Sequence, residues 1–205
     1  MLRRSLASRP ALAIAAAAGG FVLALGITAA AATPARPTVS TTHTFHFKLV
    51  RAPGIKACLP RAGGNVTITT GSLHDTMKVS VHGLPGHTAF DLFVIQMPNR
   101  PFGISWYQTD IRTGSTGTGT ATVTGVFDTQ TFAVSPGGTT TFAPTHVYHL
   151  GLWFNRTTEP FLIGCEATAT SPEVTPFNGK HHAGIQVLNT ANFPLSKGPL
   201  AHLHR

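Results

Sequence analysis

Carboxylates are the scarcest charged groups in this chain of 205 residues. The sequence holds 7 Asp and Glu against 15 Lys and Arg, and charged residues make up 11% of it. Catalysis by a carboxylate pair, as in most glycoside hydrolases, would have to come from a few scattered positions. Four aspartates are candidates, and their spacing favours no two of them: Asp75, Asp91, Asp110 and Asp128. The sequence therefore predicts no catalytic carboxylate pair.

Other signatures of catalysis and of nucleic-acid binding are also missing. The segment Gly103-Ile104-Ser105-Trp106 lacks the second glycine of a Gly-x-Ser-x-Gly motif, which would present a nucleophilic serine. No run of basic residues is interleaved with aromatic ones, so nucleic acid is not an expected partner. These absences favour a non-catalytic protein and leave enzyme activity as the less favoured alternative.

The chain has only two cysteines, Cys58 and Cys165. Neither belongs to a Cys-x-x-Cys or Cys-x-x-His pair, so the two alone are not expected to bind a metal. In an exported protein the expected outcome is one disulfide, and two free buried thiols are the alternative. Such a bond would close a loop of about 100 residues, which the chain-entropy relation values at about 4–5 kcal/mol.

Charge is absent from Ala11 to Ala32, a segment that follows Arg3-Arg4 and Arg9 and consists, apart from Thr28, of Ala, Leu, Gly, Val, Ile and Phe. A basic start, an apolar stretch and a small-residue end at Ala30–Ala32 predict a secretory signal peptide over residues 1–32. An uncleaved membrane anchor is the alternative, because about 20 apolar residues suffice to span a bilayer. The arginine pair leaves both the general and the twin-arginine export routes open. After cleavage no membrane span is expected, and an extracellular or cell-surface location, in a bacterium, is predicted.

The remaining chain divides by composition into three parts. Residues 33–41 are predicted to be a disordered lead-in, residues 42–190 one β domain, and residues 191–205 a C-terminal tail. Removal of the leader takes three arginines with it and leaves a net formal charge of +5 with histidine neutral. A modest positive charge favours acidic partners such as a cell-wall polymer.

Helical periodicity is absent after the leader, and strand patterns replace it. Alternation of apolar and polar residues in Met77–His82 and Thr120–Phe127 predicts strands with one buried face. The run Ala89–Ile95 is apolar at both parities, which predicts a central strand covered on both faces. Its one charge, Asp91, is expected to lie near an exposed strand end or to be hydrogen-bonded within the fold.

Short strands separated by Gly, Pro and Thr turns predict the fold class. About nine strands argue for an all-β protein, an antiparallel β-sandwich of immunoglobulin-like or jelly-roll-like type with one disulfide. Ten segments are candidates for these strands: Thr42–Val50, Asn65–Thr70, Met77–His82, Ala89–Ile95, Ile104–Ile111, Thr120–Phe127, Gln130–Val134, Thr145–Phe154, Phe161–Thr170 and Ala183–Asn189.

The segment Val79–Val94 combines a Val-x-Val-x-Gly-Leu-Pro-Gly pattern with a following apolar strand. It resembles the corresponding hairpin of CHRD-type and superoxide-dismutase-like secreted β-sandwiches. Those families place a His-x-His pair on the following strand as metal ligands, whereas this chain has Phe90-Asp91-Leu92-Phe93 there. The resemblance therefore implies the fold and not the metal chemistry.

Histidines are the candidate metal ligands. His43 and His46 lie three positions apart on an expected strand, so they point to opposite faces and should not chelate together. A Cu or Zn site would need three or four ligands that converge in space. The candidates for such convergence are His74, His82, His87 and His149. No other cofactor is expected.

Aromatic side chains are the candidate ligand contacts. Trp106, Tyr107 and Trp153 could stack on sugar rings, with Asp110 among the polar contacts. The other polar candidates are Gln108, Asn155 and Arg156. Trp106 and Tyr107 are expected on opposite faces of their strand, and at least one tryptophan is expected in the core.

Taken together, these patterns predict a secreted, non-catalytic β-sandwich that acts as a binding or structural module, with an unspecified ligand. A Cu- or Zn-binding protein and a carbohydrate-binding protein are the two alternatives. The sequence does not predict the oligomeric state.

Overall fold

The computed structural model describes residues 42–127, 148–176 and 182–203. These residues belong to one compact unit, Val39–Arg205. The predicted signal peptide (1–32), the predicted lead-in (33–41) and the predicted strand Gln130–Val134 lie outside the described residues. Within the described ranges, no helix is both long enough and apolar enough to cross a membrane.

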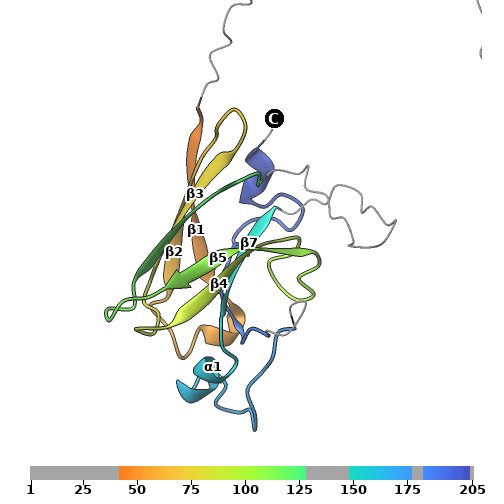
Figure 1. Ribbon diagram of the computed structural model, residues 1–205. Helices are drawn as coiled ribbons and strands as arrows, with labels where there is room; N and C mark the ends of the chain where they lie inside the picture. The colour runs from red at the N-terminus through yellow and green to blue at the C-terminus, as the bar shows by residue number, and fades with distance from the viewer. Residues whose placement is uncertain (1–41, 128–147, 177–181, 204–205) are drawn as a thin grey trace, which may run out of the picture. The chain divides into compact units, whose positions relative to one another are not determined.

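Eight antiparallel strands form one sheet in the order β5-β4-β7-β8-β1-β2-β3-β6 (Figure 1). The prediction of an all-β antiparallel fold is therefore confirmed, with eight strands in the described residues where about nine were expected. The strands are β1 (Thr44–Arg51), β2 (Gly63–Thr69), β3 (Asp75–His82), β4 (Ala89–Ile95), β5 (Ser105–Arg112), β6 (Gly119–Gly125), β7 (His149–Phe154) and β8 (Gln186–Asn189).

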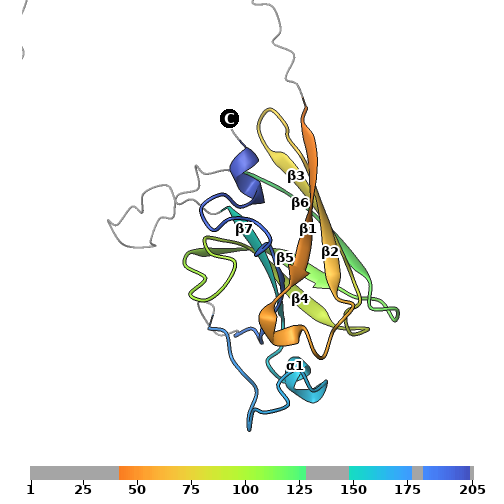
Figure 2. The ribbon, with the colours of Figure 1, turned by 180° about the vertical axis from the view of Figure 1, so that it is seen from behind.

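The sheet consists of two halves that meet at a short contact. We call β1, β2, β3 and β6 the threonine half, and β4, β5, β7 and β8 the covered half. Among the described strands, the two halves pair only where Val50 and Arg51 of β1 oppose Asn189 and Leu188 of β8. Side chains from both halves belong to one buried cluster, which includes Val66 and Met77 from one half and Leu92 and Leu152 from the other. The halves therefore face each other across a shared core, as the two opposite views show (Figures 1 and 2).

The outer face of the threonine half is solvated, as its alternating sequence predicts. In β3, Met77, Val79 and Val81 are buried, while Lys78 between them is exposed. In β6 the exposed positions are threonines. A sheet with one wet face requires only alternate residues to be apolar, and this half follows that rule.

The outer face of the covered half is buried by irregular segments. Every residue of β4 is buried, which confirms the expectation drawn from its continuous apolar run. Phe93 and Ile95 on its outer side pack with Trp153 and Ala183 in a second cluster, against which Phe102 also packs. The β4–β5 connection and the segment that leads into β8 supply this cover.

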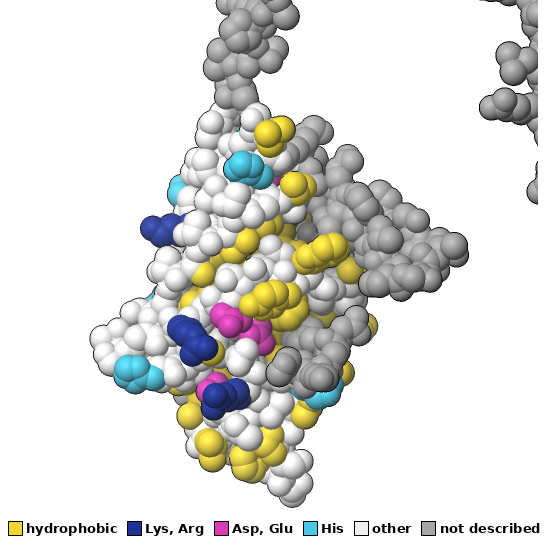
Figure 3. Space-filling model, in the orientation of Figure 1, with side chains coloured by type: hydrophobic (Ala, Val, Ile, Leu, Met, Phe, Trp, Pro, Cys, Tyr) yellow, Lys and Arg dark blue, Asp and Glu magenta, His cyan; other side chains and the backbone are white. Residues whose placement is uncertain are grey.

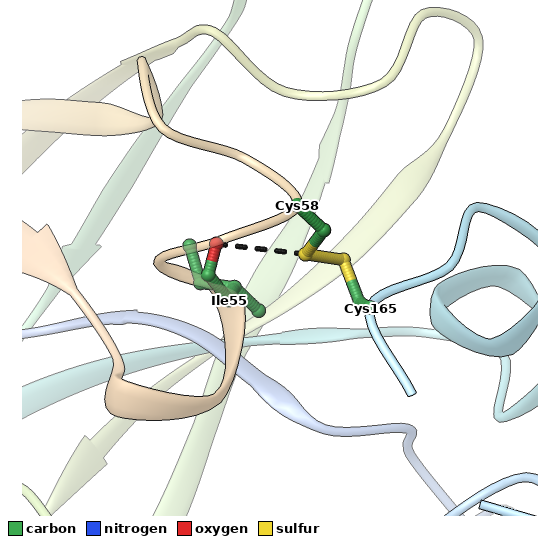
Figure 4. Close-up of a disulfide and its surroundings, with 3 residues drawn as sticks. All are labelled: Ile55, Cys58 and Cys165. Carbon is green, nitrogen blue, oxygen red and sulfur yellow. Dashed lines mark hydrogen bonds between the residues drawn. A yellow bond between two sulfur atoms is a disulfide. The ribbon is translucent and has the colours of Figure 1, made fainter. Parts of the chain in front are cut away.

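One disulfide, Cys58–Cys165, ties the two halves together, and its prediction is confirmed. Its Cα atoms lie 5.1 Å apart, and Cys58 Sγ lies 3.5 Å from the carbonyl oxygen of Ile55 (Figure 4). Cys58 follows the 3-10 helix η1 (Pro53–Ile55) in the β1–β2 connection. Cys165 follows the helix α1 (Thr158–Leu162), which comes after β7.

The prediction of a strand over Phe161–Thr170 is wrong, because α1 and turns occupy this segment. Pro160 lies near the start of α1, where a missing backbone donor carries little cost. Gly164 follows the helix with a φ of 79°, a left-handed conformation that commonly ends helices at glycine.

The segment after residue 190, predicted to be a tail, packs on the fold. Leu200 is 0% exposed and Leu203 is 2% exposed, and both join the main core. The 3-10 helix η2 (Pro199–His202) carries Leu200, whose backbone N–H donates to the carbonyl of Tyr148 at 3.1 Å. This segment therefore closes one end of the core.

Candidate functional site

A groove of about 1690 Å³ lies over the outer face of the covered half. Asp91 and Phe93 of β4, with Tyr107 and Asp110 of β5, line its floor. Segments before β5, after β7 and before β8 line its walls: residues 100–105, 155–158, 174–176 and His182. Figure 3 shows acidic side chains beside exposed hydrophobic ones in the middle of one face, with basic side chains to their left and below them.

A β-bulge places the polar floor of this groove. Leu92 of β4 pairs with Thr109, but Phe93 pairs with Tyr107, so Gln108 is an extra residue in β5. In a regular strand Tyr107 and Asp110, three positions apart, would point to opposite faces. The extra residue restores them to one face. The Tyr107 hydroxyl donates to Asp110 Oδ1 at 2.7 Å.

Two carboxyl groups face each other across β4 and β5, because Asp91 and Asp110 are direct partners in the ladder. Like charges placed directly opposite in a sheet are destabilising. Asp91 is only 9% exposed, whereas Asp110 is exposed. The side-chain amide of Asn155 donates to Asp91 Oδ1 at 2.7 Å. Each carboxyl group thus has one hydrogen-bond donor of its own and a second carboxyl group as its neighbour.

The environment shifts the proton affinities of this cluster. Burial raises the pKa of Asp91 to about 6; the hydrogen bond from Asn155 opposes this shift, and the neighbouring Asp110 and Glu159 add to it. Burial, followed by the hydrogen bond to Asp110, raises the pKa of Tyr107 to about 12. At pH 7 Asp91 is therefore mostly ionised and Tyr107 is a neutral phenol, and near pH 5 Asp91 is mostly protonated.

Aromatic rings support the floor in a series of edge-to-face contacts. The centroids of Tyr107 and Phe93 lie 5.6 Å apart, those of Phe93 and Trp153 lie 5.5 Å apart, and those of Phe102 and Trp153 lie 4.9 Å apart. Trp153 is 0% exposed, which corrects the prediction that it contacts a ligand. Trp106 and Tyr107, at 41% and 52% exposed, both line the groove and remain available for stacking.

Hydrogen bonds and one ion pair hold the wall that precedes β5. The buried side-chain amides of Gln186 and Asn189 each donate to the carbonyl of Pro98 at 3.1 Å. Arg100 forms an ion pair with Glu173 and lies over the ring of Phe102, 5.8 Å from its centroid. The wall is thus tied both to β8 and to the segment that follows α1, so the groove is preorganised.

One buried hydroxyl in the groove has no hydrogen-bond partner within the described ranges. Thr175 is 3% exposed and lines the groove, and its Oγ1 has no hydrogen-bond partner among the described residues. Leaving a buried hydroxyl unpaired costs about 1–3 kcal/mol. A ligand that hydrogen-bonds to Thr175 would recover that cost.

The structure does not bring together the four histidines considered as metal ligands. His74 precedes β3 and His82 is its last residue, so the length of the strand separates them by about 25 Å. His87 is exposed in the turn between β3 and β4. Within the described ranges, no group of three or more His, Cys, Asp or Glu side chains could hold a metal ion. The expectation that these four histidines converge on a metal ion is therefore wrong.

The fourth of them, His149, is buried and fully engaged. Its Nε2 donates to the carbonyl of Leu195 at 3.0 Å, and its Nδ1 lies 2.9 Å from the Thr190 hydroxyl. A ring whose two nitrogens are so paired is a structural residue. Burial lowers its pKa, and the hydrogen bonds oppose that shift.

Sequence reasoning identified part of this site. Trp106, Tyr107 and Asp110 all line the groove, and Asn155 joins them through its bond to Asp91. Their binding of a ligand stays a prediction. Of the two alternatives for Asp91, hydrogen bonding within the fold is the one observed. The pairing of Asp91 with Asp110 was missed, and its only signal was a lone charge in an apolar run. Comparisons with family models, with curated proteins and with solved structures find no match to this chain.

Proposed function

We propose that this protein is a secreted, non-catalytic binding module and that the groove on its covered half binds a glycan. The observation that carries the proposal is the Asp91–Asp110 pair, placed beside Tyr107 in an open, preorganised groove. Carboxyl groups placed directly opposite in a sheet are destabilising, and a carboxyl group whose pKa is raised, as that of Asp91 is, often belongs to a functional site.

The shape and chemistry of the groove favour an oligosaccharide. Its volume of about 1690 Å³ exceeds the range of about 300–1000 Å³ that is usual for small-molecule pockets. Exposed aromatic rings such as Trp106 and Tyr107 can stack on sugar rings, and carboxylates can accept hydrogen bonds from sugar hydroxyls. An elongated, hydroxyl-rich ligand uses both features.

Secretion is supported by the sequence and is compatible with the disulfide. Residues 1–32 have the order of regions that defines a signal peptide. The Cys58–Cys165 bond belongs to a class that persists in oxidising compartments. A binding module at the cell surface or in the medium would meet glycans there.

The proposal is tested by intrinsic fluorescence titration with three soluble β-linked hexasaccharides, built from glucose, from N-acetylglucosamine and from glucosamine. Trp106 lines the groove, so its emission should change with saturable binding of at least one of them. Tyr107→Ala should weaken that binding about tenfold or more, since stacked aromatics dominate binding energy.

Thr122→Ala, on the solvated face of β6, is the matched control and should bind as the wild type does. Absence of saturable binding by all three saccharides, or equal loss in both variants, would contradict the proposal.

A further inference from the structure

We propose that the ligand carries a protonated amino group, which binds between the carboxylates of Asp91 and Asp110, and that the ligand class is an amino sugar with free amines. This inference rests on the proposed function, because it names the chemistry of the ligand in the same groove.

The charge balance around the pair calls for an external cation. The chain has only 7 Asp and Glu against 15 Lys and Arg, yet two of those carboxylates oppose each other on neighbouring strands. The groups that shift the pKa of Asp91 are Asn155, Asp110 and Glu159, and none of them is a cation. No cation of the described part of the chain is therefore among the groups that set the pKa of Asp91.

The nearby arginines have other partners. Arg100 is paired with Glu173 on the groove wall. Burial raises the pKa of Glu159, and the charges of Arg156 and Arg112 partly oppose that rise. Each of these arginines thus acts on an acid outside the opposed pair.

An ammonium group fits this geometry better than a neutral hydroxyl does. It carries three donors and no acceptor, so it can bond to both carboxylates at once. Its charge offsets the repulsion between the two carboxylates, and each hydrogen bond becomes a charge-assisted one. The face of Tyr107, which is 52% exposed beside Asp110, can add a cation–π contact.

A second, independent observation also points to a ligand. The hydroxyl of Thr175 is buried in the same groove without a partner among the described residues. Sugar hydroxyls that flank an amine supply donors and acceptors for such a group. An ammonium ion without a sugar would leave both this hydroxyl and the aromatic rings unused.

The same charges disfavour an acidic polymer in this groove. Two adjacent carboxylates repel phosphate and uronate groups, although the net positive charge of the chain would attract such polymers elsewhere on the surface. The groove is therefore expected to bind a cationic ligand, whereas acidic polymers would bind elsewhere on the surface.

The test is calorimetric titration at pH 6.5 with the three hexasaccharides, which share a β-linked pyranose backbone and differ at carbon 2. The glucosamine hexamer should bind at least tenfold more tightly than the N-acetylglucosamine hexamer, whose acetyl groups remove the charge. Asp91→Asn and Asp110→Asn should each abolish that preference and retain the weak binding of the neutral saccharides.

Tyr107→Ala should weaken the binding of all three saccharides and keep the preference for the glucosamine hexamer. Circular dichroism melts of each variant check that it is folded. Equal binding of charged and neutral hexamers by the wild type would overturn the inference and leave the proposed function standing. A preference that survives both asparagine variants would also overturn it. Binding of none of the three would overturn the proposed function itself.

Discussion

The outer faces of the two halves of this protein differ, although their inner faces share one core. On the threonine half the outer face is wet: in β3 buried residues alternate with partly or fully exposed ones, and in β6 partly buried residues alternate with exposed ones. On the covered half, β4 and β7 are buried along their whole lengths, and irregular segments lie over them. The candidate site occupies only the covered half.

This difference shows why a site can be built on one face and not on the other. A wet face offers screened, mobile side chains with little power to shift a pKa. The covered face provides fixed walls and partial burial, and these raise the pKa of Asp91. The cover that buries Trp153 and Ile95 therefore also creates the conditions for ligand chemistry next to them.

The largest effect on stability is expected from removal of the disulfide that ties the two halves together. Cys58 and Cys165 are separated by 107 residues. For a closed loop of this length, the chain-entropy relation predicts that replacing both cysteines with serine lowers the free energy of unfolding by about 4–5 kcal/mol. Urea unfolding of the oxidised wild type and of the double variant measures the difference. A loss below about 1 kcal/mol would show that the halves hold together without the bond.

A smaller effect should separate the two outer faces directly. Ile95 is 0% exposed on the outer side of β4, and Ile95→Ala should destabilise the protein by about 2–5 kcal/mol through lost burial and a cavity. Thr122→Ala, on the outer side of β6, should cost less than about 1 kcal/mol. Thermal and urea melts of the two variants test the contrast. Equal costs would mean that the covered face is not a second core.

Asp91→Asn should stabilise the protein, because it removes a buried carboxyl group from the covered half. The pKa of Asp91 is raised from 3.8 to about 6 in the folded state, so ionisation opposes folding at neutral pH. The asparagine variant should gain on the order of 2 kcal/mol at pH 7, by the relation of about 1.4 kcal/mol per pKa unit.

The sign of the pH dependence follows from the same shift. Between pH 6 and pH 4 the folded state holds the proton of Asp91 and the unfolded state does not, so Asp91 adds stability as the pH falls. The difference in unfolding free energy between wild type and Asp91→Asn should therefore shrink from pH 7 to pH 4. A constant difference, or a destabilised variant at pH 7, would contradict the account.

The ionisation of His149 should affect stability with the opposite pH dependence to that of Asp91, and by the smallest amount of the changes considered. Burial lowers its pKa below the usual 6.5, so its contribution to stability is complete above that value and is lost as the pH falls through the folded pKa. A proton NMR titration of its imidazole should give a midpoint below 6.5. A midpoint at or above 6.5 would mean that the ring is not held neutral by its burial next to Thr190.

The two halves also differ in how their strands could be predicted from sequence. Strands of the threonine half are predicted by alternation of apolar and polar residues, because one face meets water, as Met77, Val79 and Val81 show. The buried run Ala89–Ile95 is readable because it is apolar throughout. The local sequence pattern predicts a strand around Cys165, because it does not show that Pro160 lies in the first turn of a helix and that Gly164 follows its end.

The site itself depends on register, which sequence does not encode locally. The extra residue Gln108 decides that Tyr107 and Asp110 share a face, and the pairing of β4 with β5 decides that Asp91 opposes Asp110. Tyr107 and Asp110 could be named as candidates from residue type alone. Their geometry required the tertiary fold, as did the burial of Trp153 beneath them.

The central claim, that Asp91 and Asp110 form a partly buried, mutually coupled pair, is tested most directly by carbon-13 NMR titration of the Asp91 carboxyl group. The account predicts a midpoint of about 6 in the wild type and a lower midpoint in Asp110→Asn, where the neighbouring charge is gone. A midpoint near 3.8 that is unchanged in the variant would contradict it, because the two carboxyl groups would then be separate and solvated.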